Sequence, residues 1–290
     1  MKIRFHGDWT LRHIIASVTL VTLGITVTFD AWSDMLHIAS RDEESSHIFL
    51  VPIVALWLFW VRRGRWRQCH PTGTFVGTAL VTIGWLLYAV GDTYLIQTFW
   101  HGGAVIIVLG CLLTVLGQDV LFRYMPAFVV LGFLVPVPAL VRQQIALPLQ
   151  DATATVTHGL LVALGFDIGL AGNVLSINGS EVAVAEACNG LRMVFALTLV
   201  SYAFAFGTPL RMHVRLLVLA ASPASAIFFN VIRLVPTVWL YGYYPVTVAD
   251  AFHDISGWIM LPIAFMGLMG MIYLLRWALV PVTRYTLAYD

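Results

Sequence analysis

Long, nearly uninterrupted apolar runs are the feature that most limits what this chain can fold into. A helix needs about 20 apolar residues to cross the hydrocarbon core of a bilayer. Of the 290 residues, 60% are hydrophobic and 11% are charged, so the runs fill most of the chain. We predict an all-α integral membrane protein, with one multi-pass domain over 1–290. About eight transmembrane helices are expected at 11–31, 47–61, 74–91, 96–117, 124–141, 188–207, 214–241 and 253–277.

The basic residues predict the orientation of these helices, because Lys and Arg collect in cytoplasmic loops. With eight spans, 12 of the 16 basic residues fall on one side, namely Lys2, Arg4, Arg12, Arg62, Arg63, Arg65, Arg67, Arg123, Arg211, Arg215, Arg276 and Arg284. Both termini are therefore expected in the cytoplasm. An uncleaved first helix is preferred to a signal peptide, since residues 27–34 offer a poor cleavage site. A net charge of +1 argues against a nucleic-acid partner.

The longest segment outside the expected spans, residues 142–187, divides into two parts. Residues 142–166 alternate polar and apolar side chains in a way that suits an amphipathic helix at the outer interface. Residues 174–177 and 181–184 flank Asn178-Gly179, a dipeptide typical of tight hairpin turns. Asn178 also begins a glycosylation sequon, but the turn is the simpler reading. We expect a short β-hairpin just before the sixth span.

A polar heptapeptide, residues 186–192, begins the sixth apolar run. Cys188 alone is as readily a packing residue as a nucleophile, since cysteine is often buried. Asn189 is a favourable N-cap, and the positive end of a helix favours the thiolate. Arg192 lies four residues later on the same helical face and adds positive potential, while Glu186 precedes the thiol. These features make Cys188 a candidate nucleophile.

Two later apolar runs also contain polar residues. Arg233 lies inside the seventh run, where a guanidinium is costly unless it is paired or faces a polar cavity, although it could also reach the surface by snorkelling. Asn230 lies three residues earlier, on the same face.

His253 is expected to open the eighth helix beside Asp254, and an imidazole there is either a surface residue or a proton carrier. His47 is a second histidine expected on the same membrane face. The side chains of Cys188, Arg233 and His253 meet if helices six, seven and eight pack together.

Taken in order, these motifs resemble the exosortase/archaeosortase family. The resemblance rests on residues 186–192, on Asn230-Val231-Ile232-Arg233, and on His253 with Gly257-Trp258. Ser46-His47, residues 49–52 and Pro136-Val137-Pro138 also look like exosortase segments. The resemblance implies a bacterial plasma-membrane transpeptidase with Cys188, Arg233 and His253 as its catalytic triad. It also implies a substrate whose C-terminal sorting signal, of the PEP-CTERM type, includes a membrane helix.

The chemistry expected from this triad is thiol acyl transfer. Cys188 would attack the scissile carbonyl, Arg233 would stabilise the oxyanion, and His253 would move protons. A lipid or exopolysaccharide-linked acceptor would receive the acyl group, and no metal or nucleotide is required. The alternative is a non-enzymatic membrane assembly or polysaccharide-export subunit, in which Cys188 only packs. The sequence has no HExxH, GxSxG or GxxxxGK[ST] motif.

Overall fold

The computed structural model describes residues 9–71, 75–184 and 190–277, which are mostly helical. By length and composition, five helices among these residues can cross a membrane, or up to seven if each of two bent pairs is a single span. The expected multi-pass helical membrane protein is therefore confirmed, while the count of eight spans stays a prediction. The chain divides into two compact units, Met1–Pro138 and Ala139–Asp290, and each is described by itself below.

The secondary-structure elements in the described part of the first unit are all helices. Its elements are α1 (Leu11–Val27), α2 (Phe29–Arg41), the 3₁₀ helix η1 (Glu43–Leu50), α3 (Val51–Val61), the 3₁₀ helix η2 (Arg63–Gln68), α4 (Phe75–Thr93), α5 (Gln97–Leu116), α6 (Gln118–Arg123), α7 (Met125–Val129) and the 3₁₀ helix η3 (Val130–Leu134).

Two expected helices of this unit are interrupted. The chain bends by 76° between α1 and α2, so the helix predicted over 11–31 does not run straight through. The bend lies at the buried Thr28, whose hydroxyl donates to the carbonyl of Gly24 at 2.8 Å. The helix predicted over 124–141 is also wrong as a single element, because α7 and η3 end before Pro136 and Pro138, residues that cannot donate a helical hydrogen bond.

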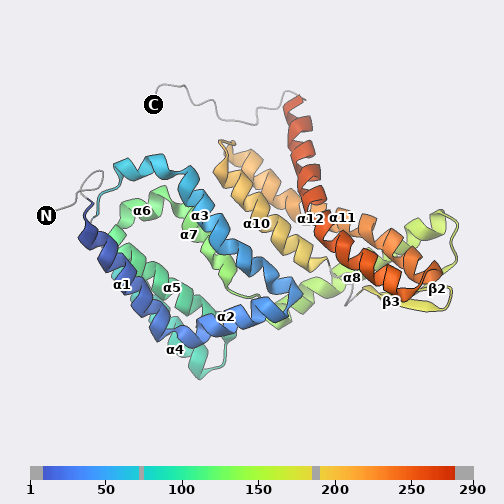
Figure 1. Ribbon diagram of the computed structural model, residues 1–290, viewed down its shortest axis with the longest axis horizontal. Coiled ribbons are helices and arrows are strands. Elements are labelled where there is room, and N and C mark those ends of the chain that lie inside the picture. Colours follow the sequence, from blue (N-terminus) through green and yellow to red (C-terminus); the bar gives the residue numbers. More distant parts are fainter. Residues whose placement is uncertain (1–8, 72–74, 185–189, 278–290) are drawn as a thin grey trace. The chain divides into compact units, whose positions relative to one another are not determined.

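Glycines allow α4 and α5 to approach each other closely (Figure 1). On α4 these glycines recur every seven residues, at Gly77, Gly84 and Gly91. A Cβ at Gly77 would lie 2.2 Å from the backbone nitrogen of Thr114, and one at Gly91 would lie 2.2 Å from that of Trp100. Small residues serve this purpose in membranes, where association depends on close packing.

This close approach predicts opposite effects for two neighbouring glycines of α5. A Cβ at Gly103 would lie 2.5 Å from the backbone nitrogen of Tyr88, whereas a Cβ at Gly102 meets nothing within 4 Å. Gly103→Ala should force α4 and α5 apart and cost about 1–3 kcal/mol. Gly102→Ala should leave stability unchanged or raise it by up to about 1 kcal/mol, since alanine favours helices. Thermal unfolding in detergent measures both, and equal melting temperatures would contradict the packing argument.

The second unit combines helices with a small sheet. Its elements are α8 (Ala139–Ala163), β1 (Ile168–Ala171), β2 (Val174–Ile177), β3 (Ser180–Ala183), α10 (Leu191–Gly207), α11 (Met212–Tyr243) and α12 (Val246–Trp277). The three strands form an antiparallel sheet in the order β1-β2-β3.

The predicted hairpin is confirmed as β2 and β3. Ile177 pairs with Ser180 across a two-residue turn, in which Asn178 has a φ of 49° and Gly179 a φ of 79°. Two positive φ angles are what this type of turn requires. A further strand, β1, precedes the hairpin and pairs with β2, which was not predicted from the sequence.

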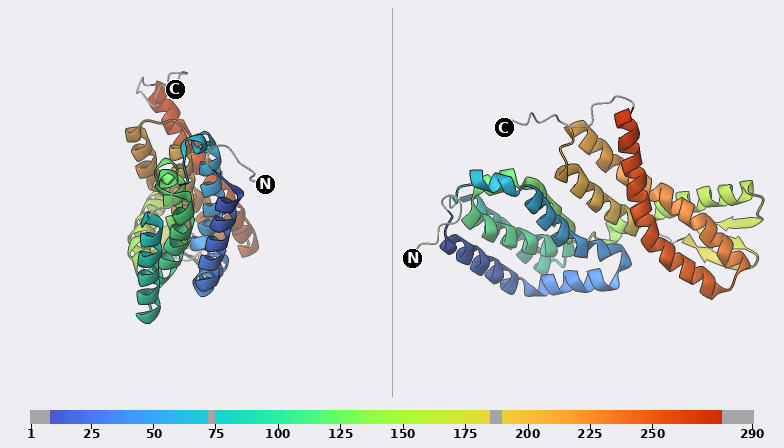
Figure 2. Two further views of the ribbon diagram at one scale, coloured as in Figure 1. Left: turned by 90° about the vertical axis from the view of Figure 1, so that its left-hand side faces the viewer. Right: turned by 45° about the horizontal axis from the view of Figure 1, so that its top comes forward.

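The sheet packs against α8 and the end of α11, as Figure 1 and Figure 2 show. Its buried side chains include Leu175 and Ile177, which meet Leu161 of α8 and Leu234 of α11. At the turn, the Asn178 side-chain amide donates to the carbonyl of Gly242 at 3.3 Å. The helix predicted over 142–166 is thus present as α8. Its place at the outer interface stays a prediction.

The last helix begins earlier than expected. The prediction that His253 opens it at 253 is wrong, because α12 starts at Val246 and places His253 about two turns inside the helix. The prediction that Asn189 caps the sixth span is wrong as well. The N-cap of α10 is Gly190, which has a left-handed backbone with a φ of 52°. Both corrections bear directly on the candidate site.

Candidate functional site

The candidate site residues divide between described and undescribed parts of the chain. Cys188, Glu186 and Asn189 lie outside the described residues. Of the others, the second unit holds Arg192 on α10, Asn230 and Arg233 on α11, and His253 and Asp254 on α12, whereas His47 lies on η1 of the first unit.

The start of α10 lies against Asn230. A Cβ at Gly190 would be 3.0 Å from the side-chain nitrogen of Asn230 and 3.3 Å from its amide carbon. The Gly190 carbonyl accepts the first helical hydrogen bond, from the backbone of Val194 at 2.9 Å. Two features favour glycine at position 190: its φ is positive, and the Asn230 amide leaves little room for a Cβ. Asn230 therefore lies where the chain leaves Cys188 and enters α10.

Arg233 is buried in the helix bundle, with 7% of its surface exposed. Its Nε makes no hydrogen bond within the part of the chain that the structure describes. A Cβ at Gly257 of α12 would lie 3.1 Å from one Nη of Arg233, so the missing side chain of Gly257 leaves room for the guanidinium. Burying a charged donor without a partner is costly. The guanidinium is thus poised to bind an acceptor.

Arg192 meets α12 in a different way. The carbon of its guanidinium lies 4.7 Å from the ring centre of Trp258, in a cation–π contact. Trp258 is 72% exposed. Gly257 and Trp258 are adjacent on α12. Gly257 lies beside Arg233 of α11, and Trp258 contacts Arg192 of α10. These two contacts and the Asn230–Gly190 contact bring α10, α11 and α12 together.

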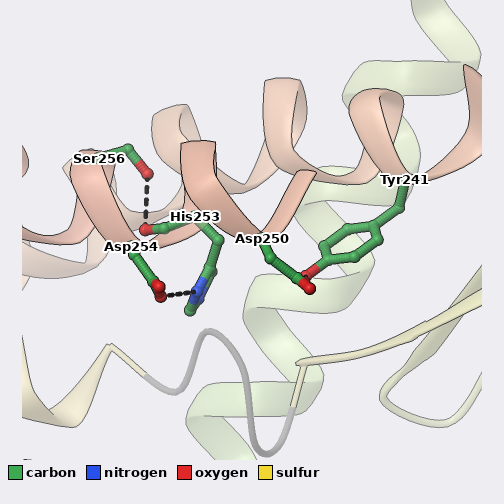
Figure 3. A network of polar contacts seen from close by, with 5 residues as sticks. All are labelled: Tyr241, Asp250, His253, Asp254 and Ser256. Carbon is green, nitrogen blue, oxygen red and sulfur yellow. Dashed lines mark hydrogen bonds and ion pairs between the residues drawn. The ribbon is translucent and has the colours of Figure 1, made fainter. Parts of the chain in front are cut away.

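His253 lies one turn before Gly257, on the same face of α12. Its side chain is 21% exposed, and Nδ1 lies 3.4 Å from a carboxylate oxygen of Asp254. Figure 3 shows His253 and Asp254 pointing to the same side of α12. The imidazole therefore lies beside a carboxylate and keeps some contact with its surroundings outside the protein.

A hydrogen bond between helices fixes the first turns of α12. The Tyr241 hydroxyl of α11 donates to the Asp250 carboxylate at 2.5 Å (Figure 3). Asp250 lies three residues before His253 and so occupies the neighbouring turn. The bond therefore holds the segment that carries His253 against the end of α11.

His47 is held by local contacts in the first unit. It is buried, and its Nδ1 lies 3.0 Å from the carbonyl of Glu44, an arrangement in which the ring donates. Asp42 caps η1 by accepting from the backbone nitrogen of Glu44 at 3.1 Å. The supporting role predicted for His47 stays a prediction.

The two described cysteines differ from a nucleophile in their surroundings. Burial raises the pKa of the Cys69 thiol, which donates weakly to the carbonyl of Arg65 at 3.5 Å. Cys111 packs near Gly24, where a Cβ would lie 3.4 Å from its sulfur. Both are packing residues. Among the described side chains, no group of three or more His, Cys, Asp or Glu residues could hold a metal ion.

The contacts that Gly257, Trp258 and Tyr241 make could not be predicted from the sequence. Gly257-Trp258 entered only as part of the family resemblance. An isolated glycine followed by tryptophan in an apolar helix gives no sign that the pair contacts two arginines on other helices. That information exists only once the helices are packed.

The fold defines a multi-helix membrane protein in which Asn230 of α11 lies against the start of α10, and Gly257 and Trp258 of α12 lie beside Arg233 and Arg192. The model of the transmembrane exosortase family matches residues 32–270, and the chain belongs to that family. Comparison with curated proteins gave no match. Comparison with solved structures gave none either.

The Arg192–Trp258 contact predicts a measurable coupling. A double-mutant cycle of Arg192→Gln and Trp258→Leu should give an interaction of about 0.5–1 kcal/mol in unfolding free energy, the size of an exposed cation–π contact. Trp258→Phe should keep part of it. Tyr273, also on α12 and 70% exposed, supplies the matched control, because Arg192→Gln with Tyr273→Leu should show no coupling. Equal coupling in the two cycles would rule out a specific contact.

Proposed function

We propose that this protein is a membrane cysteine transpeptidase that cleaves a C-terminal sorting signal of exported proteins. The observation that carries the proposal is the buried Arg233, held in the space left by Gly257, with a guanidinium Nε that finds no acceptor among the described residues. A buried donor of this kind can stabilise charge that develops on a substrate oxygen. Membership of the transmembrane exosortase family supports the same reading.

The first half of the proposed reaction forms a thioester. The Cys188 thiolate attacks the scissile carbonyl, and the carbonyl oxygen takes up negative charge beside Arg233. The peptide C–N bond then breaks. The leaving amine takes a proton from the imidazolium of His253. Cys188 precedes Gly190 by two residues, and Gly190 lies beside Asn230. Because Arg233 is one turn after Asn230 on α11, this supports a nucleophile near Arg233.

The second half transfers the acyl group to an acceptor. An amine or hydroxyl of a lipid or exopolysaccharide-linked acceptor attacks the thioester and gives its proton to His253, and the Cys188 thiolate is released. With water in place of the acceptor the same steps amount to hydrolysis. Asp254, whose carboxylate lies 3.4 Å from Nδ1 of His253, orients the imidazole, and Arg192 adds positive potential at the start of α10.

The proposal includes a topology. Eight spans would place both termini in the cytoplasm of a bacterial cell and the reacting residues at the extracytoplasmic face of the plasma membrane. The membrane helix of a PEP-CTERM-like signal would then dock laterally in the bilayer, with its cleavage site at headgroup level. Cys188 would react from outside with a membrane-impermeant thiol reagent, whereas an inert thiol would favour the non-enzymatic assembly or export subunit.

Removing the nucleophile is the direct test. Cys188→Ala should lower processing by several orders of magnitude, because without the thiol no thioester forms and the other catalytic groups cannot compensate. Mass spectrometry of the C-termini of exported proteins, compared between wild-type and variant cells, measures the loss and identifies the cleavage site. Cys111→Ala is the matched control and should process normally. Normal maturation in the Cys188→Ala strain would exclude the mechanism.

Gly257 provides a second test that leaves all three reacting residues in place. Its Cβ in Gly257→Ala would lie 3.1 Å from Nη of Arg233 and push the guanidinium by a few tenths of an ångström. Small displacements of a catalytic group are costly, and processing should fall about tenfold. Gly270→Ala, on the same helix, is the control, since a Cβ there meets nothing within 4 Å. Equal processing by the two variants would argue against a role for Arg233 at the site.

A further inference from the structure

The two outer strands of the small sheet in the second unit differ at their edges. The strands are ordered β1-β2-β3, so β1 and β3 each have one side without a neighbouring strand (Figure 1). On β1 that side is covered in part, because His158 of α8 donates through Nε2 to the carbonyl of Ile168 at 3.1 Å. On β3 the described residues supply no such bond. We call the side of β3 that faces away from β2 the open edge.

The hydrogen bonds of the hairpin show which backbone groups lie on the open edge. The Val184 amide donates to the carbonyl of Asn173, the residue directly before β2, at 2.9 Å, so this amide points toward the β2 side. Backbone groups of successive residues in a strand point to opposite sides. The N–H and C=O groups of Glu181 and Ala183 therefore point away from β2, and both residues are exposed. They are spaced as a further paired strand requires.

Packing of the sheet holds the open edge in place. Leu175 of β2 and Val182 of β3 belong to a buried cluster with Leu234 of α11. At the hairpin turn, the side-chain amide of Asn178 bonds to the carbonyl of Gly242. The strand is thus fixed before a partner arrives, which lowers the entropic cost of adding one.

The open edge leads directly to the proposed nucleophile. Cys188 follows Val184 by four residues, which span at most about 14 Å of extended chain. A peptide paired along β3 therefore has one end within reach of the thiol. Exposed, unpaired backbone groups also have to lie outside the hydrocarbon, because lipid tails offer no hydrogen bonds. That level agrees with a cleavage site among the lipid headgroups.

We propose that the open edge binds the segment of the sorting signal beside the scissile bond, as a fourth strand of the sheet. Main-chain groups of the substrate pair with the N–H and C=O groups of Glu181 and Ala183, in the manner of β-strand addition. The pairing brings the scissile carbonyl to Cys188 in a fixed orientation. This inference rests on the proposed function, because its occupant is the substrate of that reaction.

Proline on the open edge tests the proposal in cells. Ala183→Pro removes an outward N–H and puts a ring in the path of a fourth strand, while the bonds to β2 stay. Processing, measured by mass spectrometry of the C-termini of exported proteins, should fall at least about tenfold, the effect of losing one good hydrogen bond. Leu170→Pro on β1 is the matched control. The Leu170 amide also points away from β2, since it lies two residues after Ile168, and this variant should process as wild type.

A second measurement uses unaltered full-length protein in detergent. A synthetic peptide spanning the cleavage site should inhibit processing of the substrate. Methylation of its backbone amides, one at a time, should weaken the inhibition at every second position on one side of the scissile bond, because a paired strand turns alternate amides toward its neighbour. Equal weakening at successive positions would overturn the proposal. This series decides the question even if Ala183→Pro fails to fold.

The outcomes separate this inference from the proposed function. If wild-type and Cys188→Ala cells process exported proteins alike, the proposed function fails and the open edge loses its occupant. If wild-type cells process them while Ala183→Pro and Leu170→Pro act alike, only the strand pairing is wrong. A wild-type dimer that Ala183→Pro converts to monomers, with no alternation in the peptide series, would assign the open edge to a second copy of the chain and overturn the proposal.

Discussion

Polar side chains inside apolar helices bond to their own helix or to a neighbouring one where they can, because hydrocarbon offers no hydrogen bonds. This requirement determines how the helices of each unit pack. In the first unit the buried His101 of α5 lies 2.9 Å from a carboxylate oxygen of Asp34 on α2. In the second, Ser225 of α11 donates to the carbonyl of Ala264 on α12 at 3.3 Å. Each such contact fixes one helix pair, and the apolar side chains fill the space between.

Glycine works differently in the two units. Along α4 and α5 it admits the backbone of the neighbouring helix, which gives a close and purely structural contact. In the second unit it admits side chains instead. Gly190 lies against the Asn230 amide and Gly257 against the Arg233 guanidinium, so two glycines from different helices accommodate two polar residues one turn apart on α11. The candidate site therefore depends on the small size of Gly190 and Gly257 as much as on its polar side chains.

The sequence predicted elements whose signals are local. Asn178-Gly179 specified the hairpin because few other dipeptides accept two positive φ angles. The early start of α12 was not predicted, since the apolar run was taken to begin at His253. Tyr241 stabilises that turn from α11, a contact that requires the tertiary fold. The strand β1 was not predicted either, because it forms by pairing with β2.

The spacing of the candidate site residues could be read from the sequence, but their surroundings could not. Spacing placed Asn230 and Arg233 on one face, and their burial agrees with that. Spacing could not distinguish the two arginines. Arg192 rests on an exposed indole and keeps access to water, so its charge is well screened and its contribution is small. Arg233 is buried, where a charge acts more strongly on a nearby oxygen. That difference in solvation is the physical reason to assign charge stabilisation to Arg233 and a supporting part to Arg192.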